Sequence, residues 1–253
     1  MIEKVEVLVA TMHQNDEHLL EKMNIQTDAI VGNQCDINEI KSFVWRKHTV
    51  KWLSFNEHGV GLNRNNTLMR ATGDICIFAD DDMIYVDGYA DIVRRAFKEI
   101  PEADVIIFNL IEPIPKRYII PKIKKVTWMN YLRYGTARIA VRLAPVRLNG
   151  IFFNLCFGGG TEYSHGEDNL FLTDCLRKGL KIYAYPEYIA RLTEERESTC
   201  NRGSLEKSLR DQGALFYQIS HRFWHLLCLQ HIIRHGKMYD MNWIKAYLKM
   251  VKR

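Results

Sequence analysis

The chain has 253 residues, 47% of them hydrophobic and 26% charged, which is the composition of an ordinary globular protein with a sizeable core. No apolar run approaches the roughly 18 residues of a transmembrane helix, and the charged start MIEKVEVLVATMH does not have the pattern of a signal peptide. The six cysteines are scattered, without a CxxC pair or zinc-ligand spacing, so we expect a reducing, cytoplasmic environment.

The formal net charge of +5 is unevenly distributed along the chain. Residues 204–253 hold nine Lys/Arg and three Asp/Glu, a balance of +6, whereas residues 1–203 hold 26 and 27, a balance of −1. The basic excess therefore belongs to the C-terminal segment.

Short apolar runs alternate with helical patterns from the N-terminus onward. Strands are predicted at Val5–Ala10, Ala29–Val31, Lys51–Phe55, Ile75–Asp80, Asp104–Leu110 and Leu180–Tyr185, the last closed by Pro186. Helices are predicted from His18, from the Gly59–Asn66 turn to about Ala71, over Val86–Glu99, and over Asn169–Lys178. This alternation predicts an α/β fold with a mostly parallel central sheet flanked by helices.

The segment from Leu205 to Arg253 has a helical pattern with an apolar stripe. The stripe consists of Phe216, Ile219, Phe223, Leu226, Leu227 and Ile233. A basic, aromatic-rich amphipathic segment is typical of contact with an anionic bilayer surface, but residues 216–233 fit a helix packed on the rest of the protein equally well. For the end of the chain, Trp243–Arg253, we expect anionic lipid.

One stretch, Gly73–Asp82 (GDICIFADDD), places three consecutive carboxylates directly after a buried strand. Asp80, Asp81 and Asp82 repel one another there unless a positive charge lies nearby. Because ligands bind at the carboxyl ends of strands in open α/β sheets, the stretch predicts a site for a divalent cation, Mn²⁺ or Mg²⁺. The alternative is a solvated acidic turn.

A second acidic pair, Glu167 and Asp168, stands where a helix begins. The helix dipole favours negative charge at that position, so we expect Asp168 to be ionised at neutral pH. The pair fits a helix cap as well as a catalytic role.

Four motifs in this order, VEVLVATMH, GVGLNRNN, ICIFADDD and GGGTEYSHGEDNLFLTDCLRKGLKIYAYPE, resemble the family 2 glycosyltransferases of the GT-A fold, over about residues 4–200. The resemblance implies a catalytic domain at 1–203, with a nucleotide-binding half at 1–110 and an acceptor and base half at 111–203. Residues 204–253 are then a helical, amphipathic and basic tail.

The family's roles fall on matching positions of this chain. The resemblance implies that Asp80 and Asp82 serve the metal and nucleotide, with Asp81 assisting, and that Asp168, beside Glu167, is the general base. It places Arg64, Ala10 and Thr11 near the nucleotide, and Gly158, Gly159 and Gly160 can let the backbone approach the donor sugar. Ser198, Thr199 and Arg202 are candidates for a lid over the diphosphate.

Two departures from the family pattern affect these expectations. The aspartate-rich turn that reads the base in relatives is Gly32-Asn33-Gln34-Cys35-Asp36 here, so uracil recognition falls to Asn33 or Asp36. The chain also lacks the QxxRW motif of processive synthases, which favours transfer of one sugar over polymer synthesis.

The resulting expectation is an inverting, metal-dependent transfer of one sugar from a nucleotide sugar, UDP-linked by analogy, to a lipid-linked saccharide in surface polysaccharide synthesis. The protein would lie at the inner face of the cell membrane, with no nucleic-acid partner. Two alternatives stay open: a nucleotidyltransferase acting on sugar phosphates, although VATMHQND lacks a glycine-rich phosphate loop, and a non-catalytic nucleotide-binding module.

Overall fold

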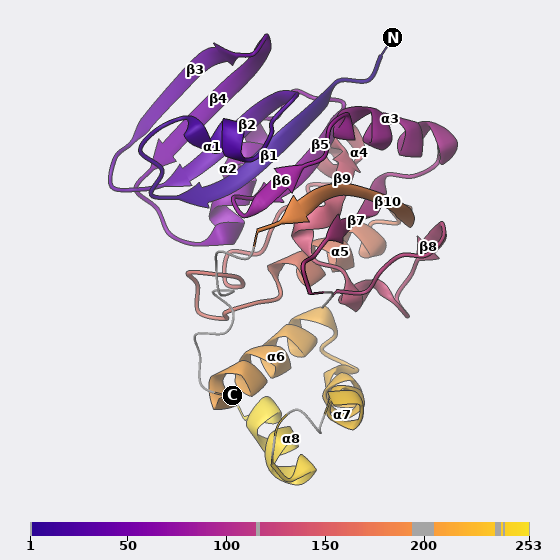
Figure 1. Cartoon of the computed structure of the whole chain (residues 1–253). Helices are drawn as coiled ribbons and strands as arrows, with labels where there is room; N and C mark the ends of the chain where they lie inside the picture. The colour runs from indigo at the N-terminus through magenta and orange to yellow at the C-terminus, as the bar shows by residue number, and fades with distance from the viewer. Residues whose placement is uncertain (1, 115–116, 194–204, 236–238, 240, 253) are drawn as a thin grey trace.

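A computed structural model describes residues 2–114, 117–193, 205–235, 239 and 241–252. Its centre is one sheet in which the strands follow the order β3-β4-β2-β1-β5-β9-β7-β10-β6, with β8 paired to β10 (Figure 1). The strands are β1 (Val5–Met12), β2 (Asp28–Gln34), β3 (Glu39–Trp45), β4 (His48–Phe55), β5 (Ile75–Asp80), β6 (Met83–Tyr85), β7 (Val105–Ile111), β8 (Lys124–Val126), β9 (Ile139–Arg142) and β10 (Ile182–Leu192).

Helices cover the sheet and extend the chain beyond it. They are α1 (His18–Lys22), α2 (Val60–Arg70), α3 (Tyr89–Glu99), α4 (Leu143–Leu148), α5 (Glu167–Arg177), α6 (Leu205–Ile219), α7 (Trp224–His235) and α8 (Trp243–Val251). Two short 3-10 helices, Tyr131–Arg133 and Thr136–Arg138, precede β9. The α/β architecture predicted from the alternating pattern is confirmed.

The pairing is parallel where the strand and helix alternation is regular. β4, β2, β1 and β5 pair parallel to one another, as do β7 and β10. β9 inserts between β5 and β7, antiparallel to both. The second half of the sheet is therefore mixed.

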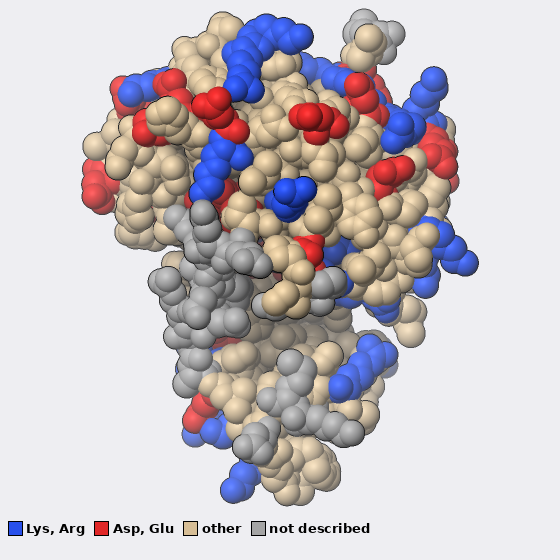
Figure 2. Space-filling view, in the orientation of Figure 1, with Lys and Arg blue, Asp and Glu red and all other residues tan. Residues whose placement is uncertain are grey.

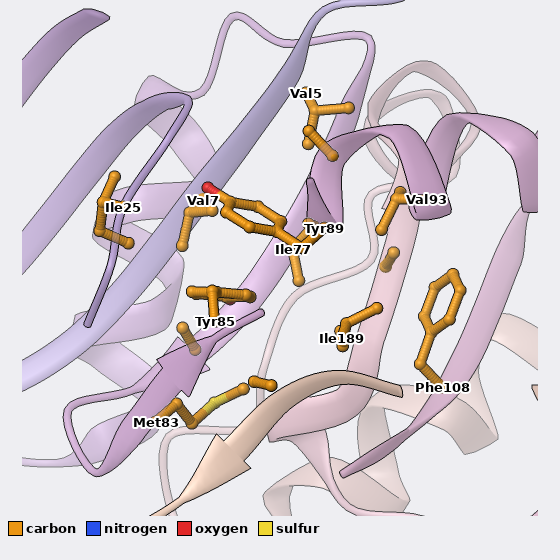
Figure 3. Close-up of a cluster of buried hydrophobic side chains, with 14 of the residues drawn as sticks. Val5, Val7, Ile25, Ile77, Met83, Tyr85, Tyr89, Val93, Phe108 and Ile189 are labelled. Carbon is orange, nitrogen blue, oxygen red and sulfur yellow. The ribbon is translucent and has the colours of Figure 1, made fainter. Parts of the chain in front are cut away.

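Side chains alternate across the sheet and form a core on each face, which is why the central strands read as continuous apolar runs. Figure 3 shows one core, in which Val7 and Ile77 of β1 and β5 meet Tyr89 and Val93 of α3. The neighbouring strand residues Leu8 and Phe78 face the other side, where they join side chains of α2, α4 and α5. The acid-bearing end of β5 is thus held by packing from both faces.

Two strand predictions were incomplete. β3 forms a hairpin with β4 that we did not predict, and its turn residues Arg46 and Lys47 both have positive φ, at 44° and 72°. Such turns usually carry Asn-Gly or Asp-Gly, so the sequence gives little sign of this one. The predicted end of the last strand at Tyr185 was wrong: β10 continues to Leu192, because register shifts on either side of Tyr188 accommodate Pro186.

The C-terminal helices α6, α7 and α8 pack together as a bundle below the sheet (Figure 1). Phe157 and Leu170, from the sheet-bearing part, join the bundle's core. Helices α6 and α8 approach so closely that a Cβ on Gly213 would lie 1.8 Å from the Met250 carbonyl oxygen.

The predicted apolar stripe of this segment does not lie on one face. Phe216 and Ile219 are buried in the bundle core, together with Trp224, Cys228 and Ile232, whereas Phe223, Leu226 and Ile233 are exposed. The turn between α6 and α7 resets the helical phase, so a stripe drawn through both helices is broken.

Candidate active site

The carboxyl ends of β1, β2 and β5 meet at one edge of the sheet. Ala10 of β1 lies opposite Asp80 of β5, and Thr11 lies opposite Asn33 of β2. The Thr11 hydroxyl donates a 2.6 Å hydrogen bond to the Asp81 carboxylate. The predicted nucleotide-binding positions of β1 are therefore adjacent to the acid triplet.

Arg64 joins the two acidic centres that the sequence separates. From the first turns of α2, its guanidinium donates to Asp80 at 2.6 Å and to Glu167, at the start of α5, at 2.8 Å. Arg64 is only 4% exposed. Burial alone would lower the pKa of Arg64, but the two carboxylates outweigh it and raise this pKa above its usual range. The guanidinium is thus a permanent charge that holds β5 and α5 together.

The environment of Asp82 fits a bound cation. Burial, and after it the charges of Asp80 and Asp81, raises the pKa of Asp82 to about 6. A divalent ion would relieve this repulsion, and Mg²⁺ or Mn²⁺ needs only one or two protein carboxylates when phosphate oxygens and water complete its shell. Within the described residues no three His, Cys, Asp or Glu side chains gather as a ready-made metal site. The donor set suits an ion shared with a diphosphate.

Asp168 is a more basic carboxylate than the helix dipole alone suggests. Its carboxylate accepts the Asn169 backbone N–H at 2.7 Å, yet burial and then the charge of Glu167 raise the pKa of Asp168 to about 7. Our expectation of full ionisation at neutral pH was therefore wrong, because desolvation outweighs the dipole. A carboxylate with a pKa near 7 is well matched to general-base chemistry at neutral pH.

The Gly158–Gly160 loop packs tightly against the start of α2 and against Glu167 at the start of α5. Gly158 has a φ of +107°, and a Cβ there would lie 2.6 Å from Val60 and 2.9 Å from the Glu167 carboxylate. The Gly159 carbonyl accepts the Val60 N–H at 3.0 Å. Only glycine lets the loop pass between the start of α2 and Glu167.

The remaining predicted positions differ in their surroundings. The Asn33 side chain is buried, and its amide pairs with the backbone N–H and carbonyl of Gln14 at 3.0 and 2.9 Å, so it shapes the turn after β1. Asp36 is exposed beyond the end of β2. Ser198, Thr199 and Arg202 lie outside the described residues.

Contacts that support the site from distant segments were missed by the sequence reasoning. Buried Asp211 of α6 accepts hydrogen bonds from the Ser164 backbone N–H at 2.9 Å and from its hydroxyl at 2.7 Å, three residues before Glu167. The Thr193 N–H donates to the Asp82 carbonyl at 2.8 Å. An aspartate in an amphipathic helix is normally expected on the surface, so the local sequence gives no indication that Asp211 is buried against Ser164.

Comparisons with known proteins identify the fold. The sequence matches no family model and no curated protein. Among solved structures it is similar to S. aureus TarS 1–349 in complex with UDP-GlcNAc, with 17% identity over 98% of this chain and 82% of that one, at a TM-score of 0.66. The same TarS fragment with UDP gives 17% identity over 98% and 81%, at 0.65. A longer TarS chain gives 15% identity, covering 96% of this chain and 54% of that one, at 0.63. The protein has the GT-A glycosyltransferase fold.

Proposed function

We propose that this protein is an inverting, metal-dependent glycosyltransferase that moves one sugar from a UDP-linked donor to a saccharide acceptor. The observation that carries the proposal is the Arg64 bridge, because it unites Asp80, at the end of β5, with Glu167, at the start of α5, in one cluster. The fold supports it, since the similar TarS structures are described as complexes with UDP-GlcNAc and UDP.

The donor's diphosphate would lie at the carboxyl ends of β1 and β5. Asp82 and Asp80 would hold Mn²⁺ or Mg²⁺, which neutralises charge developing on the leaving diphosphate. Thr11 restrains Asp81, and Arg64 restrains Asp80, so two of the three carboxylates are oriented before the donor arrives. Such preorganisation lowers the reorganisation needed in the transition state.

Transfer itself would be a single displacement. The acceptor hydroxyl oxygen attacks the anomeric carbon while the bond from that carbon to the diphosphate oxygen breaks, and the electron pair leaves with UDP. Asp168 takes the hydroxyl proton, for which its raised pKa suits it. Attack on the face opposite the leaving group inverts the anomeric centre. The proposed acceptor is a lipid-linked saccharide of a surface polysaccharide, placed at the inner face of the membrane.

The test measures donor binding and bond cleavage separately. Calorimetry with UDP should show affinity that depends on Mn²⁺ in the wild type and loses that dependence in Asp82→Ala. Asp91→Ala is the control, since it removes an acid of α3 that is 81% exposed and belongs to none of the predicted site positions. Unchanged, metal-dependent binding by Asp82→Ala would refute the metal assignment.

Product analysis distinguishes the rival activities. With a UDP-sugar, Mn²⁺ and no acceptor, slow release of UDP and free sugar supports a glycosyltransferase. Formation of UDP-sugar from UTP and a sugar phosphate, with release of pyrophosphate, would instead identify a nucleotidyltransferase. Binding without turnover across a panel of nucleotide sugars and saccharide acceptors would leave a nucleotide-binding module.

A further inference from the structure

Helix α7 has an apolar face on the side away from the bundle core. Its core side carries Trp224, Cys228 and Ile232 at a spacing of four residues. At helical spacing on the opposite side lie Leu226, Leu229 and Ile233, which are 62%, 38% and 76% exposed, and Phe223, in the turn just before the helix, is 52% exposed. Single exposed apolar residues are common on proteins, but a group of four is not explained by the packing of this chain.

Helix α8 repeats the arrangement. Ala246 and Met250 face the bundle core, while Ile244 and Leu248, four residues apart on another side, are 47% and 57% exposed. Its lysines lie on a separate side of the helix, giving an amphipathic helix with an exposed apolar face. Both helices lie at the end of the molecule farthest from β3 (Figure 1).

The charges around these faces are almost all positive. Residues 220–253 contain seven Lys/Arg and one acid, Asp240. Lys249 is paired with Glu206 at 2.7 Å. The remaining described cations of these helices and their flanks are Arg222, Arg234, Lys245 and Lys252. Figure 2 shows red and blue side chains interspersed over the sheet-bearing part, whereas those visible on the bundle are mostly blue.

We infer that the outer apolar residues of α7 and α8, namely Leu226, Leu229, Ile233, Ile244 and Leu248, together with Phe223 just before α7, bind the surface of an anionic bilayer. Apolar side chains would enter the boundary between headgroups and acyl chains while the neighbouring Lys and Arg meet anionic headgroups. Within the described residues no helix is both long and apolar enough to cross a bilayer, and the inferred contact requires no crossing.

Two other partners for this surface, a second copy of the chain and the chain's own sheet-bearing part, fit less well. A second copy of the chain would bring two strongly basic faces together, and like charges oppose that contact. The sheet-bearing part already contacts the bundle through α6, where Leu215 lies against Gly166 and Arg177 donates to the Ile219 carbonyl at 2.8 Å. Helices α7 and α8 lie beyond α6 as seen from the sheet (Figure 1).

The experiment is vesicle sedimentation of the full-length protein with a pair of matched variants. Leu226→Glu/Ile233→Glu places two acids on the proposed face. Ile40→Glu/Val44→Glu places two acids at equally exposed apolar positions of β3, where the wild-type side chains are 56% and 74% exposed. The probes are phosphatidylcholine vesicles with and without 30% phosphatidylglycerol, and melting temperatures check that both variants fold.

We expect the wild type and the β3 variant to sediment with the anionic vesicles, and the α7 variant to lose at least about tenfold in partitioning. Raising salt should weaken wild-type binding, because the screening length falls from about 10 Å at 0.1 M to about 3 Å at 1 M. Lys245→Gln/Lys252→Gln, which leaves the apolar face intact, should also bind less and keeps the test valid if the α7 variant does not fold.

Equal loss in both acid variants, or equal binding to the neutral vesicles, overturns the inference. The inference is also overturned if the wild type does not bind vesicles but forms a dimer and the α7 variant is a monomer, since the face then contacts a second copy. UDP binding is measured on the same samples. Because the α7 face is remote from Arg64 and Asp82, lost vesicle binding with intact UDP binding separates this inference from the proposed function.

Discussion

Removing the charge of Arg64 should destabilise the fold far more than removing a surface arginine. Arg64→Met keeps the length of the side chain and deletes both hydrogen bonds to Asp80 and Glu167. The Glu167 side chain is 13% exposed and would remain buried without its partner, whereas that of Asp80 is 37% exposed and can turn to water. Most of the penalty therefore falls on Glu167.

Breaking a buried ion pair by removing one partner destabilises by about 3–5 kcal/mol. In a chain of this size each kcal/mol lowers the melting temperature by roughly 2–4 °C, so Arg64→Met should melt roughly 6–20 °C below the wild type. The melting temperature of Arg64→Lys should lie between those of the wild type and Arg64→Met, because one ammonium group cannot reproduce the two-pronged guanidinium that bonds both carboxylates. Adding Glu167→Gln to Arg64→Met should recover part of the lost melting temperature, since no buried carboxylate is then left without a partner.

The matched control is Arg46→Met. Arg46 also forms a guanidinium–carboxylate ion pair, with Glu21 at 3.0 Å, but the two side chains are 53% and 60% exposed. Such a surface pair contributes at most about 1 kcal/mol. Thermal denaturation by circular dichroism measures all four variants. Equal melting temperatures for Arg64→Met and Arg46→Met would refute the bridge as a structural element.

The other predictions concern the base and its support. Asp168→Asn should keep donor affinity and slow transfer by roughly a hundredfold or more, as separate binding and rate measurements would show. With a pKa of Asp168 of about 7, wild-type kcat/KM should rise with pH through neutrality, and Glu167→Gln should move that rise to lower pH by removing a neighbouring charge. Asp211→Ala removes the acceptor of both Ser164 hydrogen bonds and the partner of Lys207, so we expect a lower melting temperature and a lower kcat with little change in donor KM. Ser164→Ala keeps the backbone bond to Asp211 and should lose less. An unchanged kcat in Asp211→Ala would show that α6 does not position Glu167 and Asp168.

The parts of the fold that local pattern determines were predictable. β1, β2, β5 and β7 are apolar runs buried on both faces, and their positions follow from the local hydrophobic pattern of the sequence. The acid triplet's place at the sheet edge follows too, because parallel strands end together. The GT-A resemblance was stated on four motifs, and the fold it implied is confirmed.

What escaped prediction depends on partners distant in the chain. Arg64 and Glu167 are 103 residues apart, and no local pattern says that an arginine opening a helix will bond a glutamate opening another. The pKa of Asp168 is raised by burial, which the sequence around it does not report. Asp211 owes its burial to the packing of α6 on α5, and its role could not be read before that packing was known.

Helix α6 connects the two proposals physically. One side of it holds the loop before Glu167 through Asp211 and Ser164, and its other neighbours are α7 and α8, which carry the inferred bilayer surface. A protein attached through α7 and α8 would therefore have the loop before Asp168 one helix away from lipid. That arrangement suits an acceptor carried on a lipid, because a saccharide emerging from the headgroups would approach the half of the protein that holds Asp168. A soluble acceptor would gain nothing from it, so the rate on lipid-linked acceptors should fall in Leu226→Glu/Ile233→Glu while the rate on the same saccharide freed from lipid stays at the wild-type value.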